Sequence, residues 1–490
     1  MPIFKSALML TGVNLLLRLV GTSFQVYLSS RIGAAGIGLL QLTMSIGSLA
    51  MVAGMAGIRT ASMYLTAEEL GKGHPQNVTW VLSECFRYSI LCSGTISLLL
   101  FLSAPWLAES WIGDIRTLPA LRLFAVFLPC TCLSGVMTGY FTAANRIGTL
   151  AAVEVAEQLC SMAVTMTSLH FWAGTDPGRA CLCVVMGGAF SGFFTLVTLL
   201  TLRLNEKSHC GKPIPIWKRL AKTAVPLAFA DDFKSGINTL ENLMVPKRLS
   251  LYPGTAEPLA DFGRITGMVF PILMFPSCIL FALAELLIPE LARCNAADIR
   301  ARISYLVRRS LKAAMLYGIL FGGLLFLLAE PLCIKLYQSA EAGRYLKLYA
   351  LLVPMLYCDA ITDAMTKGLG QQTACVRYNI LTSALDVLFL FLLLPRYGMM
   401  GYFLSFLLTH LLNFFLSLRR LLKISGESIP WHIPMLAISA TILATWIGTQ
   451  FTRQFWQLLT YLTSLAALLR LLKVVQTGDV HWIRSMMRKK

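Results

Sequence analysis

The stretch FLPCTCLSGVMTGYFTAANRIGTLAAVEVAEQL, residues 127–159, contains two apolar segments separated by a short polar turn. A second stretch, LVPMLYCDAITDAMTKGLGQQTACVRYNILTSA at 352–384, has the same pattern at a constant offset of 225 residues, which places Pro129 on Pro354. Identity between the two is weak, so the similarity lies in the order of apolar helix, polar turn and apolar helix. Internal repeats of this kind are typical of transporters, which bind substrate between two halves near the membrane midplane.

The composition assigns the rest of the chain to the same class. The 490 residues are 56% hydrophobic and 13% charged, whereas soluble proteins average about 45–50% apolar and about 25% charged residues. So few charges cannot cover the roughly three soluble domains that the length would otherwise suggest. A disordered chain would lack these bulky apolar residues. We therefore predict an all-α polytopic membrane protein.

Fourteen segments approach the length of about 20 mainly apolar residues that a spanning helix needs. They are residues 6–30, 36–65, 82–104, 118–142, 149–172, 180–203, 218–246, 260–289, 311–330, 345–367, 374–394, 398–419, 433–450 and 455–475. The polar linker at 203–218 divides spans 1–6 from spans 7–12. We predict two pseudo-symmetric six-helix lobes, residues 1–205 and 206–425, followed by two additional helices and a basic tail at 426–490.

The distribution of Lys and Arg residues indicates which side of the membrane each loop faces. Of the 42 Lys and Arg residues, 26 lie on the side of the two termini and 12 on the opposite side. Because cytoplasmic loops are enriched in Lys and Arg, both termini are predicted in the cytoplasm of a cell-membrane protein. The net charge of +18 is thus a topology signal, and we expect no nucleic-acid partner. The first apolar stretch carries Arg18 and lacks a cleavage site, so it is predicted to be an uncleaved span.

Signatures of catalysis and metal binding are missing from the sequence. The pairs Cys130/Cys132 and Cys181/Cys183 lie in apolar segments without a nearby His or carboxylate, which argues against a metal. The sequence has no HExxH, GxxxxGK[ST] or GxSxG motif. We predict no catalytic residue, no metal and no cofactor, and the sequence leaves open whether H⁺ or Na⁺ is a coupling ion.

Polar residues inside spans are costly and point to a functional cavity. In span 1, Thr11, Asn14, Arg18, Thr22 and Gln25 recur at spacings of three and four, which places them on one helical face. Hydrogen bonding between helices is the alternative for Asn14 and Gln25. That alternative suits Arg18 less well, because an unpaired guanidinium in mid-span is expensive.

Span 7 repeats this pattern with Asp231, Lys234, Asn238 and Glu241 on one face. We predict that this face lies at the lobe interface or couples an ion, and the alternative is that Asp231 and Lys234 neutralise each other.

Span 10 carries Asp359, Asp363 and Lys367 at i, i+4 and i+8. The first two are predicted to serve in coupling or at the lobe interface. An internal pair of Asp363 with Lys367 is equally compatible with the spacing. Other polar residues within spans are weaker candidates: Glu154, Glu157, Glu285, Glu290, Asp386 and His410.

Three stretches resemble the stage V sporulation protein B branch of polysaccharide and lipid-linked oligosaccharide flippases. The first, residues 6–73, contains Arg-Leu-Val-Gly at 18–21, the glycine pattern at 33–41 and Ala-Gly-Ile at 56–58. The others are VPKRLSLYPGTAEPLADFGRITGMVFPILMFPSCILFALAELLIPELA at 245–292 and KGLGQQTACVRYNI at 367–380.

The resemblance implies alternating access and an isoprenoid-diphosphate-linked sugar as cargo, as in related lipid II flippases. Cavity arginines of those relatives lie in spans 1, 2 and 8. Arg18 matches the first, Arg264 is a counterpart of the third, and Arg59 lies later in span 2 than the second. Where those relatives have an Arg-Asp pair, this chain has Phe24-Gln25, which leaves lipid II itself open. We predict substrate binding by Asn14, Arg18, Gln25, Arg59 and Arg264, in a monomer.

Other functions remain as alternatives. A cation-coupled multidrug exporter of the same superfamily would depend on Asp231, Glu241 and Asp359 more than on Arg18. A membrane-embedded glycosyl or acyl transferase predicts catalytic carboxylates or His beside a long loop, which the sequence lacks. A scaffold would explain neither polar stripe. A role in sporulation rests on the family name, because related proteins also serve vegetative peptidoglycan synthesis.

Overall fold

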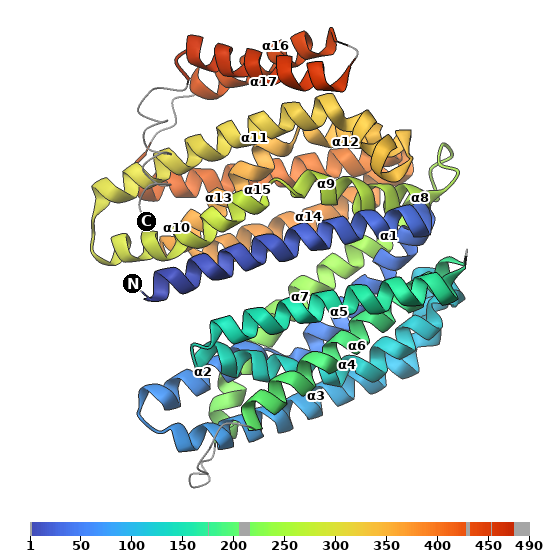
Figure 1. Cartoon of the computed structure of the whole chain (residues 1–490), viewed down its shortest axis with the longest axis vertical. Coiled ribbons are helices and arrows are strands. Elements are labelled where there is room, and N and C mark those ends of the chain that lie inside the picture. Colours follow the sequence, from blue (N-terminus) through green and yellow to red (C-terminus); the bar gives the residue numbers. More distant parts are fainter. Residues whose placement is uncertain (1, 175, 205–215, 428–431, 452, 475–490) are drawn as a thin grey trace. The chain divides into compact units, whose positions relative to one another are not determined.

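The structure, a computed structural model, describes residues 2–174, 176–204, 216–427, 432–451 and 453–474. Every regular element in these ranges is a helix, which confirms the predicted all-α class (Figure 1). The chain forms two compact units. Unit 1 comprises residues 1–267 and 387–399, and unit 2 comprises 268–386 and 400–490.

Unit 1 is a bundle of long helices. Its helices are α1 (Pro2–Met55), α2 (Ile58–Gly71), α3 (Val78–Trp106), α4 (Leu118–Ala143), α5 (Ile147–Ser168), α6 (Pro177–Leu204), α7 (Trp217–Leu249) and the short α8 (Pro258–Gly263). Short 3₁₀ or π-helical turns extend or join them: η1 (Pro75–Asn77), η2 (Leu107–Ile112), η3 (Ile115–Thr117), η4 (Leu169–Ala173) and η5 (Arg264–Val269).

Unit 2 contains most of the remaining helices. They are α9 (Phe270–Met274), α10 (Cys278–Ala296), α11 (Arg300–Tyr337), α12 (Ala340–Ala350), α13 (Val353–Gly368), α14 (Gln372–Tyr397), α15 (Met399–Ser425), α16 (His432–Thr449) and α17 (Gln454–Leu471). The last residues of α14 belong to unit 1.

Each predicted span coincides with a helix or a pair of helices, but two junctions differ from the prediction. The predicted loop between spans 1 and 2 is a single kink inside α1 at Gly33, where φ is 75° and ψ is 173°. Span 2 is not one helix, because it breaks at Ala56 and Gly57, which have φ of 44° and 70°. Both breaks occur at glycine, the residue that adopts positive φ at least cost.

Nine helices in the described part of the chain are long and apolar enough to cross a membrane, or eleven if two bent pairs each count as one span. One of the nine combines most of α1 with α2. The polar residues of α7 keep that helix out of the count. The number fourteen therefore stays a prediction.

The repeat seen in the sequence is present in the structure. In both copies a helix ends, a left-handed residue follows, and a second helix begins, at positions 225 residues apart. These positions are Ala143 and Gly368, Asn145 and Gly370, and Ile147 and Gln372. The copies differ before the turn, since α4 is continuous, whereas α12 and α13 are bent by 56°.

The core of unit 1 gathers around α2, α3 and α4. Ile58, Cys85 and Phe141 are fully buried there, together with Leu220 near the start of α7. A salt bridge fixes the same end of α7, because Arg219 lies 2.5 Å from Glu68 and 3.2 Å from Glu69 of α2.

The core of unit 2 is aromatic. Tyr349 is fully buried, and its ring makes edge contacts with Phe270, Phe403 and Phe406. Figure 1 shows α16 and α17 as an antiparallel hairpin. Tyr461 fixes this hairpin to α11 by donating to the carbonyl of Leu320 at 2.9 Å.

Candidate functional site

Both units contain an interrupted helix at a corresponding place. The break at residues 56–57 lies in span 2, and residues 275–277 interrupt the counterpart span 8 between α9 and α10, which are bent by 63°. A break frees backbone groups that a continuous helix would pair. Discontinuous helices at matching positions of two repeats are the best pointer to a transporter's binding site.

At each break, a tyrosine from a neighbouring helix donates a hydrogen bond to a backbone carbonyl. Tyr88 of α3 donates to the carbonyl of Ala56 at 3.2 Å, and Tyr317 of α11 donates to the carbonyl of Pro276 at 2.7 Å. Helices α3 and α11 are span 3 and its counterpart span 9. The breaks are thus stabilised features of the fold.

Arg59 follows the break in unit 1 directly. It lies in the first turn of α2, where the helix dipole is positive. The backbone of this turn packs closely on α4, since a Cβ at Gly139 would lie 2.5 Å from the Arg59 carbonyl. The side chain is exposed and acts electrostatically on Glu157 of α5.

The polar face of span 1 lies next to α5. Arg18 is exposed in the middle of span 1, within α1, and its carbonyl accepts a hydrogen bond from Thr22 at 2.9 Å. One residue earlier, the Leu17 carbonyl accepts from Gln158 of α5 at 3.2 Å. Gln158 was not a candidate in the sequence, because its partner is 141 residues away. The side chain of Asn14 lies outside the described residues.

Gln25 packs against the segment that contains Arg264. Its amide donates to the Gly267 carbonyl at 3.4 Å, and Ser29 donates to the same oxygen at 3.1 Å. The interhelical bond that was the alternative role for Gln25 is therefore present.

Arg264 is largely buried and already has acidic neighbours. Its guanidinium lies 2.7 Å from Asp261 and 3.9 Å from Glu257. A phosphate at this arginine would have to compete with these carboxylates.

The polar stripe of α7 faces away from its packing surface. Asp231, Lys234 and Asn238 are exposed, and among the described residues no ion pair joins Asp231 to Lys234. The neutral pair considered for these two residues is therefore not formed. The buried face of α7 instead carries Thr239 and Asn242, which hydrogen-bond to Ser45 of α1 at 3.1 and 3.0 Å. Glu241 is half-buried and also has interaction partners.

Three aspartates within the helices of unit 2 have polar partners among the described residues: Asp359, Asp363 and Asp386. Asp363 and Lys367 form the internal pair that was the alternative role for Asp363, at 2.6 Å. Asp359 accepts a hydrogen bond from Asn413 of α15 at 3.1 Å. This acidic group is therefore held by a second helix.

Asp386, which had been a weak candidate, is the most enclosed of these carboxylates. Only 7% of it is exposed, and it accepts hydrogen bonds from Ser405 at 2.5 Å and Thr409 at 3.3 Å. A buried carboxylate that accepts from two hydroxyls can bind or release a proton within the helices, which makes Asp386 a candidate coupling group. Its partners lie 19 and 23 residues away, so the sequence pattern of one helix could not reveal them.

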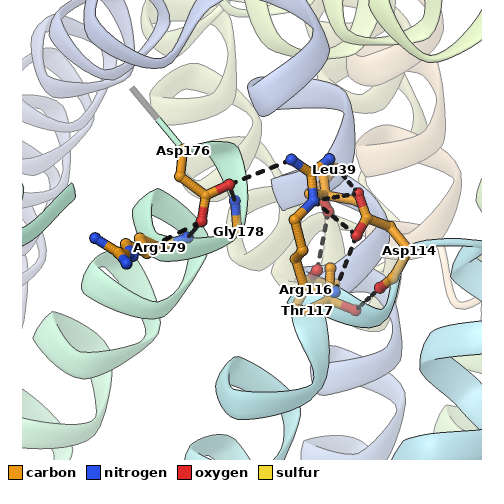
Figure 2. A network of polar contacts seen from close by, with 8 residues as sticks. Leu39, Asp114, Arg116, Thr117, Asp176, Gly178 and Arg179 are labelled. Atoms are coloured by element: carbon orange, nitrogen blue, oxygen red, sulfur yellow. Dashed lines mark hydrogen bonds and ion pairs between the residues drawn. The ribbon is translucent and has the colours of Figure 1, made fainter. Parts of the chain in front are cut away.

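A further polar network connects two loops of unit 1. Figure 2 shows Arg116 between Asp114 and Asp176, at 2.6 and 3.2 Å. Asp176 also lies 4.0 Å from Arg179. Hydrogen bonding from Arg116 holds the pKa of Asp114 below its usual value.

Two units of apolar helices, matched breaks and polar groups inside the helices define a multi-pass membrane protein with a transporter fold. The model of the polysaccharide biosynthesis protein family matches residues 3–293. The chain belongs to this family.

Individual relatives are more distant. The chain is 24% identical over 413 residues to stage V sporulation protein B of Bacillus subtilis (strain 168), covering 81% of this chain and 79% of that protein. The fold is similar to the inward closed conformation of the lipid II flippase MurJ, with a TM-score of 0.68, 13% identity, and 95% and 99% of the two chains covered.

An inward-facing multidrug resistance MATE transporter of the MOP superfamily has a TM-score of 0.67, with 12% identity and coverage of 86% of this chain and 100% of that chain. Both solved structures show the fold.

Proposed function

We propose that this protein flips a lipid-linked oligosaccharide or cell-wall precursor across the cytoplasmic membrane by alternating access, without a catalytic step. The observation that carries the proposal is the position of Arg59, on the first turn after the helix break in span 2. Helix N-termini bind anions through their free N–H groups and dipole, and an arginine binds phosphate oxygens in a bidentate manner. The family and the similarity to a lipid II flippase support this cargo class.

Arg18 would provide the second cation, because it is exposed in the middle of span 1 and this part of α1 lies beside α5. Asn14 belongs to the same helical face. Gln25 and Arg264 would shape this site through the α1 contact at Gly267 and bind the diphosphate only after Arg264 is released from Asp261.

Moving an anionic head outward is favoured by about 2.3 kcal/mol per charge per 100 mV across an inside-negative membrane. This driving force acts on the charge of the head group itself, and the proposed orientation keeps both termini in the cytoplasm. The lobes at 1–205 and 206–425, with the hairpin at 426–490, remain the proposed moving parts, in a protein that acts as a monomer.

A flipping assay tests the proposal. The protein is reconstituted into vesicles with a fluorescent isoprenoid-diphosphate sugar, and exposure of the label on the far side is followed by quenching. Arg18→Ala and Arg59→Ala should each slow flipping by at least about ten-fold, since charge-assisted hydrogen bonds contribute about 1.5–3 kcal/mol. Arg87→Gln is the matched control, because Arg87 is exposed and pairs only locally with Glu84 at 2.8 Å.

Flipping by both alanine variants at the wild-type rate, with normal folding, would refute the assignment of these arginines.

A cation-coupled drug exporter is the second candidate, and the enclosed carboxylates of unit 2 favour it. This function predicts that efflux of lipophilic cations depends on Asp359 and Asp386 and is insensitive to Arg18→Ala. Asp231, Lys234, Asn238, Glu241 and Asp363 remain proposed as coupling or lobe-interface residues under either function.

A further inference from the structure

A cavity of about 190 Å³ opens in unit 1 at the kink of α1, beside the network shown in Figure 2. Its wall includes Tyr27, Arg31, His170, Asp176 and Pro177. Arg18 and Arg59 do not line it, so it is separate from the site proposed for the cargo.

The charges around this cavity leave a net positive wall. The carboxylate of Asp176 lies near Arg116 at 3.2 Å and Arg179 at 4.0 Å, and it also accepts from the Gly178 N–H at 3.4 Å. Asp176 is therefore neutralised by its own neighbours. Arg31, in contrast, makes no ion pair within the described part of the chain and stacks near Tyr27, with its guanidinium 5.8 Å from the ring centroid.

The lining residues of this cavity lie on two defined backbone features, a helix kink and a π-helical turn. Arg31 stands two residues before the kink at Gly33, and His170 lies in the π-helical turn η4. The turn ends at Gly174, whose φ of 55° and ψ of −132° suit only glycine. The kink and the π-helical turn thus bring Arg31 and His170 to the lining of one cavity.

Aromatic side chains place this cavity at the depth of lipid headgroups. Phe171 is 77% exposed and Trp172 is 64% exposed, directly after His170. The amphipathic ring of tryptophan is enriched at membrane–water interfaces, so Trp172 carries this argument. The cavity has room for a phosphate group and a few water molecules, at about 30 Å³ per water.

We propose that this pocket binds the phosphate of a membrane lipid headgroup, with Arg31 as the charged donor and His170 as a second N–H donor. A neutral or a protonated imidazole can each donate at least one hydrogen bond. The predicted topology places the pocket in the leaflet opposite the cytoplasm. A resident phospholipid and an isoprenoid diphosphate carry the same phosphate chemistry, so the pocket does not depend on the proposed cargo.

Binding to the purified full-length protein tests this proposal. Delipidated protein in a non-ionic detergent is titrated with three probes: a short-chain phosphatidylglycerol, an isoprenoid diphosphate and inorganic phosphate. Bound lipid is counted by native mass spectrometry. Arg31→Gln, alone and combined with His170→Gln, is compared with Arg122→Gln, which removes an exposed arginine of α4 outside the pocket.

We expect Arg31→Gln to weaken binding of at least one lipid probe by about ten-fold or more, with a further loss in the double variant. The lipid probe whose binding is weakened by the substitution identifies the source of the phosphate. The Arg122→Gln control should bind as wild type does.

Unchanged binding of both lipids to the double variant would overturn the proposal. A second result would also overturn it: inorganic phosphate binds as tightly as the lipids do, and the variants weaken its binding by the same factor. The pocket would then recognise free phosphate. Since both variants change exposed side chains, a normal melting midpoint is expected and is measured alongside. The flipping assay with Arg18→Ala fails or succeeds independently of this result.

Discussion

Helices α1 and α8 approach each other closely at Gly263, and this contact predicts that a larger residue there lowers the stability of the protein. A Cβ built on Gly263 of α8 would lie 2.0 Å from the carbonyl oxygen of Ala34 and 2.6 Å from the N of Gly38, both in α1. In the reverse direction, a Cβ on Gly38 would lie 2.2 Å from the Leu259 carbonyl oxygen. All these neighbours are backbone atoms, which cannot rotate away, so Gly263→Ala must push α8 from α1.

The size of the effect follows from the displacement. Real Cβ contacts are essentially never shorter than 3.0 Å, so the helices must separate by about 1 Å, and overpacking of this kind costs about 1–3 kcal/mol. The same shift would stretch the hydrogen bonds of Gln25 and Ser29 to Gly267, each contributing about 0.5–1.5 kcal/mol. We therefore expect a destabilisation of about 3 kcal/mol.

Thermal unfolding of the purified protein measures this effect. Gly188→Ala in α6 is the matched control, because Gly188 is exposed and a Cβ there meets nothing within 4 Å. The control should leave the midpoint unchanged or raise it slightly, since alanine favours helix over glycine by up to about 1 kcal/mol. A Gly263→Ala midpoint equal to or above wild type would refute the tight α1–α8 contact.

Three further predictions concern polar groups. Tyr88→Phe and Tyr317→Phe each leave the carbonyl at a helix break without its tyrosine partner, and each should destabilise the protein by about 1–3 kcal/mol, as seen in the melting midpoint; unchanged midpoints would show that the tyrosines do not hold the breaks. Asp386→Asn keeps a hydrogen-bonding side chain but removes the charge. We expect an imposed Na⁺ or H⁺ gradient to change the flipping rate of the wild type and not that of the variant, while the variant stays folded. A variant that retains this dependence would exclude Asp386 as the coupling group. The pKa of Asp114 is lowered by its hydrogen bond from Arg116, so its stabilisation is present at neutral pH and is lost as the pH falls below about 4. Asp114→Asn should therefore lower the midpoint at neutral pH, by up to about 1 kcal/mol of stability, and match wild type in acid; a difference that persists in acid would contradict the pair.

The apolar segments and the repeat could be predicted from the sequence because they depend on local composition. The register of the helix–turn–helix at 127–159 and 352–384 needed only the polar turn and the two prolines. The break at Ala56–Gly57 was missed, because the apolar pattern continues across it and the length of the segment suits one helix. The sequence predicted a loop of several residues between spans 1 and 2. The structure has a kink at Gly33 instead, because a single glycine with positive φ can change the direction of a helix.

The site could be predicted only where its contacts are local. The pair of Asp363 and Lys367 follows from their spacing within one helix. The contact of Asp359 with Asn413 spans 54 residues, and no periodicity connects two such positions. Arg31 was counted only as a loop charge, because nothing in the sequence brings it to His170.

The two units share an interrupted helix, but the charged residues within their helices differ. Each has an interrupted helix whose freed carbonyl is bound by a tyrosine from the equivalent helix. In unit 1, Arg59 follows the break directly, whereas unit 2 holds the carboxylates Asp359 and Asp386 within its helices. We propose that unit 1 binds the anionic head and that unit 2 holds a coupling cation. This division predicts separable effects, because loss of Arg59 should lower the affinity for the lipid diphosphate, and loss of the Asp386 charge should alter only the ion dependence.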